Sequence, residues 1–178
     1  MMGYQNYGNS QGYGSRSGNF GGGQKREKID LTYAPTLENF TFYTNGKITE
    51  KLFDDIAENI SKTFIGKNSE GHADHVSATQ VRKIYDEVKG FEKYFISSTK
   101  SDWEEKKPYI KMLKSKVAYT VARKGVTKGV YKNFEKFISD CVNQTKEEKD
   151  YFVFLSLFEA VYGFYTRVLL ENGFKLND

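Results

Sequence analysis

The chain has 178 residues, with 27 Lys or Arg against 23 Asp or Glu and a formal charge of +4. This length accommodates one domain, or a modest domain with a tail, rather than two full domains. The single cysteine, Cys141, excludes an intramolecular disulfide framework and a Cys-based zinc knuckle. No charged segment followed by an apolar run opens the sequence, so we expect a cytoplasmic protein without a secretory signal.

The N-terminal residues have the composition of a segment that does not fold. Half of the sixteen glycines lie in residues 1–24, where aromatic rings are spaced among Ser, Asn and Gln. Without aliphatic runs to bury, such a segment does not recover the entropy lost on ordering. We therefore expect a disordered Gly/Tyr-rich tail over residues 1–27, an irregular lead-in over 28–46 and a single α-helical domain over 47–178.

Apolar residues then recur every three or four positions, as on the buried face of an amphipathic helix. The spacing predicts one helix from Ile48 to Phe64, followed by a polar loop over residues 66–75. Ser77 and Gln80 have the spacing of a capping box, in which each side chain hydrogen-bonds the other residue's backbone. They predict the start of a second helix.

Three more helices complete the domain. Pro108 fits the first turn of a third helix, where its missing amide costs nothing, and Gly125 is suited to ending that helix. The apolar spacing of residues 130–141 predicts a fourth, and Thr145 and Glu148 form the capping box of a fifth. Because no strand alternation is found, the sequence predicts an all-α protein, a compact helical bundle of about five helices.

The fifth helix is apolar nearly all round over residues 151–165. This run is shorter than the roughly twenty residues of a membrane span, contains Glu159 and is followed by Arg167. We therefore expect a core helix and no membrane partner. Glu159 is predicted to be a buried carboxylate, and Arg123 or Arg167 its partner in a structural ion pair.

The positive charge is concentrated in one stretch. Residues 76–128 carry thirteen basic and six acidic side chains, and no acidic residue lies between Lys106 and Lys128. Exposed helix faces usually mix charges, because like charges one turn apart repel. A solvated helix face is one interpretation; the lack of opposite charges favours a polyanion such as RNA or DNA.

Helical geometry sorts these cations into rows. Lys116, Tyr119 and Arg123 share a face away from the apolar stripe, while Lys111 and Lys114 lie in a second row. Lys and Arg bind phosphate, and an aromatic ring can stack on a base. Gln80 is a helix-start residue that could also contact a sugar or phosphate. The candidate RNA-binding residues are Arg82, Lys83, Lys111, Lys114, Lys116, Tyr119, Arg123, Lys124 and Lys128.

Sequence motifs of catalysis are missing. The chain has no P-loop, no dinucleotide-binding glycine pattern, no nucleophile elbow and no catalytic carboxylate pair. His72, Asp74 and His75 lie close together, which leaves a metal-dependent hydrolase as an alternative, but they lack the metal-binding helical spacing. We expect a protein that is not an enzyme and holds no cofactor or metal.

Three stretches together resemble a known family. Residues 76–83 (VSATQVRK), 113–124 (LKSKVAYTVARK) and 158–165 (FEAVYGFY) are similar, in this order, to the small subunit of type III-A CRISPR effector complexes, the Csm family. The resemblance implies a non-catalytic helical subunit that stacks with copies of itself as an inner filament. It would lie beside the duplex of guide RNA (crRNA) and target RNA and bind target RNA in antiviral defence.

The resemblance also implies partners and site residues. The partners are the repeated backbone subunit, which cleaves target RNA, and the large subunit, which carries nuclease and cyclase chemistry. Matching basic or aromatic positions are Arg82, Lys114, Lys116, Tyr119 and Arg123, and Glu159 matches a buried carboxylate.

The chain also departs from the family's pattern. Ala122 and Lys124 flank Arg123 where the family usually has Gly and Glu, and Thr166 stands where Lys is common. Two alternatives remain open from the sequence. One is the small subunit of another type III CRISPR complex, and the other is a helical protein–protein adaptor with a basic docking face.

Overall fold

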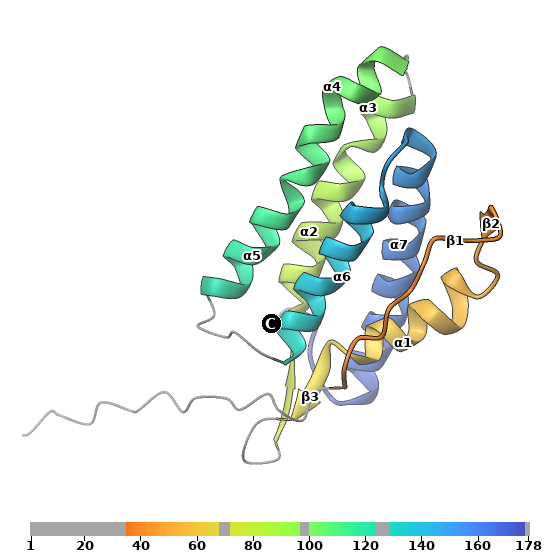
Figure 1. Ribbon diagram of the computed structural model, residues 1–178. Helices are drawn as coiled ribbons and strands as arrows, with labels where there is room; N and C mark the ends of the chain where they lie inside the picture. The colour runs from red at the N-terminus through yellow and green to blue at the C-terminus, as the bar shows by residue number, and fades with distance from the viewer. Residues whose placement is uncertain (1–34, 68–71, 97–99, 124–128, 177–178) are drawn as a thin grey trace, which may run out of the picture.

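The computed structural model describes residues 35–67, 72–96, 100–123 and 129–176 (Figure 1). The predicted tail over residues 1–27 lies outside this part of the chain, as do Lys124, Gly125 and Lys128. Within the described residues the fold is a helical bundle with two very short hairpins, so the predicted all-α class is confirmed.

Long helices run side by side along one direction of the bundle (Figure 1). They are α2 (Ala78–Gly90), α4 (Lys100–Lys111), α5 (Leu113–Arg123), α6 (Val130–Gln144) and α7 (Glu148–Glu171). The short α3 (Glu92–Ile96) follows α2. Only Met112 separates α4 from α5, and its amide donates to the carbonyls of Pro108 and Tyr109, both at 3.2 Å. The two helices therefore form one nearly continuous rod.

Pro108 lies inside α4, so its predicted place in a first helical turn was wrong. The preceding residues are held by tertiary contacts that the local proline rule does not consider. Trp103 is buried, its indole nitrogen donates to the Lys146 carbonyl at 3.3 Å, and its ring lies 5.3 Å from that of Phe95. This anchoring lets the helix begin at Lys100.

The predicted helix from Ile48 to Phe64 is replaced by shorter elements. Strands β1 (Tyr43–Thr44) and β2 (Lys47–Ile48) pair across the turn at Asn45 and Gly46, both of which have positive φ. A π-helical turn, η2 (Leu52–Ile56), then leads into α1 (Ala57–Lys62). Leu52 is buried as the spacing predicted, whereas Ile48 is 47% exposed because it belongs to the hairpin.

Part of the predicted polar loop is also a hairpin. Strand β3 (Ile65–Lys67) pairs antiparallel with β4 (Ala73–His75), with Ile65 opposite His75. Three-residue strands are too short to produce a readable alternation of polar and apolar residues, so the sequence pattern did not reveal them.

Helix α7 is the core helix, as predicted. Eleven of its 24 residues are buried, and it packs against α1, η2, α2 and α6. Two phenyl rings of α6 pack against Phe158 of α7: those of Phe134 and Phe137 lie 6.4 and 5.3 Å from it, and Phe137 also lies 5.8 Å from Phe64. By length and composition alone α7 could cross a bilayer, but here its buried apolar side chains pack against the other elements of the bundle.

Two predicted capping boxes form differently. Ser77 is the N-cap of α2, but its side chain makes no capping hydrogen bond. The Thr145 hydroxyl donates to the Cys141 carbonyl at 2.9 Å and closes the last turn of α6 instead of opening α7. The box of α7 starts at Glu147, with Asp150 as its second member.

Candidate nucleic-acid interface

Helices α2 and α5 lie side by side and run in opposite directions (Figure 1). Leu113, Val117 and Val121 are buried, so α5 turns its polar side chains outward. On α2, Gln80, Lys83 and Glu87 follow one another at helical spacing along a single stripe. This stripe faces α5, where it meets three side chains of the predicted basic row: Lys116, Tyr119 and Arg123.

Lys116 lies at one end of the groove between α2 and α5 and is paired with a carboxylate. The Lys116 ammonium lies 2.6 Å from a carboxylate oxygen of Glu87, which reaches it from α2. The sequence of α5 contains no acid, and for that reason the pattern indicated an uncompensated charge here. Helix packing supplied the missing carboxylate from a distant part of the chain.

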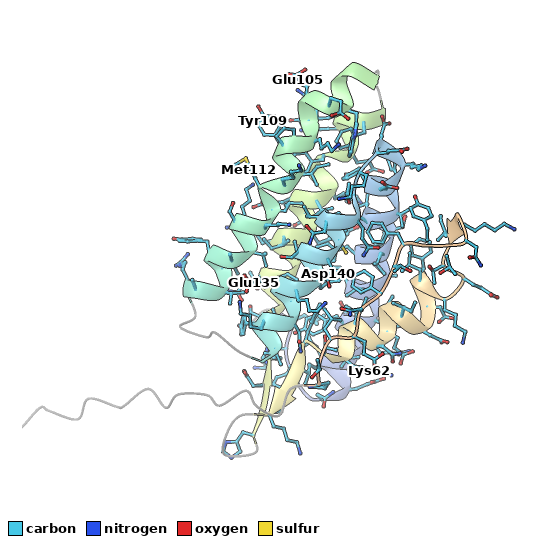
Figure 2. All side chains as sticks on the ribbon, viewed as in Figure 1. Lys62, Glu105, Tyr109, Met112, Glu135 and Asp140 are labelled. Carbon is cyan, nitrogen blue, oxygen red and sulfur yellow. The ribbon has the colours of Figure 1, made fainter. Side chains whose placement is uncertain are left out.

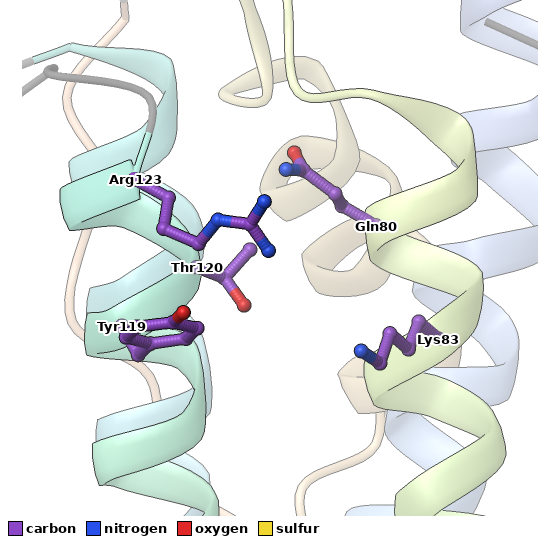
Figure 3. A pocket seen from close by; sticks show the side chains of 5 residues that line it. All are labelled: Gln80, Lys83, Tyr119, Thr120 and Arg123. Atoms are coloured by element: carbon purple, nitrogen blue, oxygen red, sulfur yellow. The ribbon is translucent and has the colours of Figure 1, made fainter.

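One turn further along, the groove opens into a cavity of about 340 Å³, which we call the α2–α5 pocket (Figure 3). None of its five lining side chains is acidic. They are Gln80, Lys83, Tyr119, Thr120 and Arg123. Figure 3 shows Lys83 and Gln80 projecting from α2 toward the side chains of α5.

The two cations of the pocket differ from Lys116. In the described part of the chain, no carboxylate forms an ion pair with Lys83 or Arg123. The Arg123 guanidinium instead lies 5.7 Å from the centre of the Tyr119 ring, a cation–π contact that leaves its charge uncompensated. The structure thus brings three of the predicted residues, Lys83, Tyr119 and Arg123, into one acid-free pocket.

Gln80 and Thr120 supply the polar groups of the pocket. The Gln80 amide oxygen is buried and has no hydrogen-bond partner among the described residues. The Thr120 hydroxyl donates to the Lys116 carbonyl at 2.9 Å. Thr120 was missed by the sequence, because a threonine on a helix face carries no signal of its own and only the register of the two helices reveals it.

The other predicted cations stand apart from the pocket. Arg82 lies 3.7 Å from Asp86 on its own helix, and Lys114 donates to the side-chain oxygen of Asn143 on α6. Lys111 is exposed at the end of α4. It directly precedes Met112, whose side chain projects from the edge of the bundle (Figure 2). Lys124 and Lys128 lie outside the described residues.

The prediction of a buried carboxylate on α7 was wrong. Glu159 is exposed, because it follows the buried Phe158 by about 100° around the helix. Arg167, its proposed partner, is also exposed and lies 2.9 Å from Glu58 and 3.7 Å from Glu171. Both are surface ion pairs; the first ties α7 to α1, and the second lies within α7.

The predicted polar segment near β4 is structural in character. His75 packs against the Phe174 ring, with centroids 3.9 Å apart. Among the residues that the structure describes, no three His, Cys, Asp or Glu side chains are grouped as metal ligands.

The single cysteine lies buried on α6. Burial raises the pKa of the Cys141 thiol well above its usual range, which keeps it in the unreactive protonated form.

Comparison with known proteins adds one finding. The family model described as Csm2 Type III-A matches residues 48–168. The match spans α1 to most of α7 and includes every residue that lines the α2–α5 pocket. No curated protein and no solved structure matches the chain.

Proposed function

Since the chain belongs to the type III-A Csm2 family and is thus a subunit of a Csm complex, we propose that it binds RNA through the face formed by α2 and α5. In this proposal it is a cytoplasmic, non-catalytic structural subunit that serves antiviral defence. Copies of the chain stack as an inner filament beside the guide RNA–target RNA duplex. The other partners are the repeated backbone subunit and the large nuclease and cyclase subunit.

One observation carries the RNA-binding proposal: Lys83 and Arg123 line the same pocket, and no carboxylate lines it with them. Two cations that share a small cavity repel each other unless an anion lies between them. A phosphate satisfies both, because Arg presents a planar fork of donors and Lys a compact charge. The exposed Tyr119 beside them adds a surface on which a base can stack.

The test is a salt titration of RNA affinity with the full chain. Each phosphate contact contributes about 0.9 to the slope of log affinity against log salt for a duplex, and about 0.7 for a single strand. Replacing Lys83 and Arg123 with Ala is therefore expected to lower the slope by roughly 1.4 to 1.8 and to weaken binding at low salt. Circular dichroism should show an unchanged helical signal, since both side chains lie on the surface.

A matched control removes two cations elsewhere. Lys51 and Lys149 are highly exposed, and each is paired with a nearby carboxylate. Their double Ala variant has the same net charge as the Lys83 and Arg123 variant. Equal slopes for the two double variants would contradict the assignment of the α2–α5 face.

A protein–protein adaptor is a second candidate. Tyr109 and Met112 are 53% and 50% exposed, and they project from the same edge of the bundle (Figure 2). Exposed apolar side chains of this kind are common at protein interfaces. Purification of a tagged chain that yields a type III-A backbone subunit together with RNA supports the RNA-binding subunit, whereas protein without RNA supports the adaptor.

A further inference from the structure

We propose that the α2–α5 pocket receives one unpaired nucleotide of the bound RNA, with its phosphate near Lys83 and Arg123 and its base against Tyr119. This inference rests on the proposed RNA-binding function and adds a preference to it. Contacts to phosphates alone would treat a continuous duplex and an interrupted one alike, whereas a pocket distinguishes them.

The size of the pocket suits a single nucleotide. Its volume of about 340 Å³ falls at the lower end of the range for small-molecule sites. The Lys116–Glu87 ion pair spans the space between α2 and α5 about one helical turn from the pocket. A base held inside a duplex cannot enter such a space; only a nucleotide that has left the stack can do so.

Tyr119 provides the stacking surface. Its side chain is 65% exposed, the highest value among the exposed large apolar side chains of the described residues. The guanidinium of Arg123 lies 5.7 Å from the centre of the ring, and Thr120 lies next to it along α5. A base packed on the part of the Tyr119 ring that Arg123 leaves uncovered would shield that surface from water. The base would also lie within reach of the pocket's cations.

Gln80 gives the pocket a group that a phosphate cannot satisfy. Its amide oxygen is buried without a partner in the described part of the chain, and an unsatisfied buried acceptor is unfavourable. The phosphodiester groups of RNA are fully ionised at neutral pH and offer only acceptors. Rotation of the side-chain amide presents this oxygen to the pocket, where a base edge can satisfy it with an N–H donor from an exocyclic amine or a ring nitrogen.

The experiment compares two RNAs on the full chain. One is a blunt, fully paired RNA duplex, and the other is the same duplex with a single unpaired nucleotide in the middle of one strand. Fluorescence anisotropy gives the affinity for each. Because stacking of a base on an aromatic side chain contributes 1 to 3 kcal/mol, we expect the wild-type chain to bind the interrupted duplex at least about fivefold more tightly.

Variants assign this ratio to the pocket. Tyr119→Leu is expected to bring the ratio of the two affinities close to one, and Tyr119→Phe to retain it, since the ring remains. Gln80→Leu should lower the ratio, because the base edge loses its acceptor. Tyr109→Leu is the matched control, an exposed tyrosine on α4 outside the pocket, and should keep the wild-type ratio.

The outcomes separate this inference from the function on which it rests. Equal wild-type affinities for the two duplexes, with normal salt dependence, overturn the nucleotide pocket and leave RNA binding intact. A preference that survives in Tyr119→Leu also overturns it. Failure of the wild-type chain to bind either RNA contradicts the proposed function and the pocket together.

Discussion

Neutralising Glu87 should strengthen RNA binding, although it removes an ion pair. In the structure Glu87 occupies the Lys116 ammonium at 2.6 Å and withholds it from a ligand. The Glu87→Gln variant keeps the size of the side chain and removes its charge. Lys116 then joins Lys83 and Arg123 as a third available cation on the same face.

The magnitude follows from the geometry of the pair. A phosphate oxygen that accepts from Lys116 at about 2.8 Å lies roughly 5 Å from Glu87, because the ammonium separates the two anions. At that distance in water, repulsion between unit charges is about 0.8 kcal/mol, which corresponds to a fourfold change in affinity. The freed cation should also steepen the salt slope by about 0.9 for a duplex. The loss in protein stability should stay within about 1 kcal/mol, as for other exposed pairs.

The assay is the same anisotropy titration, carried out at several salt concentrations. Glu58→Gln on α1 is the control for net charge: its side chain is 28% exposed, as is that of Glu87, and it lies 2.8 Å from Lys62 and 2.9 Å from Arg167. This control changes the net charge by the same amount but far from α5 in sequence and on a helix that packs against α7. Equal gains for both variants would show that net charge alone acts. No gain for Glu87→Gln would refute the view that Glu87 blocks the face.

Two further predictions concern the buried tyrosines that hold the bundle together. Tyr165→Phe should lower the free energy of unfolding by about 1–3 kcal/mol, because the buried hydroxyl donates to the Val76 carbonyl. Tyr151→Phe should cost less, because its acceptor, the Val88 carbonyl, also receives a backbone amide; chemical denaturation of both variants measures the difference. Burial raises the pKa of both phenols above the usual value of 10, so the unfolded chain loses these protons first and stability should fall as pH rises above about 10. A thermal unfolding midpoint that stays constant between pH 9 and about 11.5 would contradict this reasoning.

Helical periodicity predicted the parts of the fold in which a long stripe faces the core. The fourth predicted helix is α6, and Phe134, Phe137 and Cys141 are all buried in it. The method failed where tertiary contacts override local pattern. The buried Trp103 anchors the part of α4 that precedes Pro108, so the helix begins before the proline. Ile48 belongs to a hairpin, although its spacing matched a helix. A side chain that finds its partner in a distant element leaves no trace in a local window.

The location of the candidate site could be predicted from the sequence, but its boundaries could not. The charge count identified the segment, and helical geometry correctly placed Lys116, Tyr119 and Arg123 on one outer face of α5. The count could not show which cations keep their charge available, since Glu87 lies on another helix. For the same reason Glu159 was mistaken for a buried carboxylate: apolar neighbours in sequence do not reveal on which side of a helix the core lies.

The register between α2 and α5 decides where the face is open. Along the α2 stripe a carboxylate, an ammonium and an amide follow one another, and each meets a different part of α5. Glu87 pairs with Lys116, whereas Gln80, an amide in place of a carboxylate, provides no ion-pair partner for Arg123 and has an unsatisfied amide oxygen. A second carboxylate, in place of Gln80, would lower the net charge of these five side chains from +2 to +1 and would lie near Arg123. The α2 stripe has one carboxylate and one amide, so ion pairing stabilises one end of the groove and ligand binding is favoured at the other end. This is the arrangement expected of a site that holds an anion with a base attached.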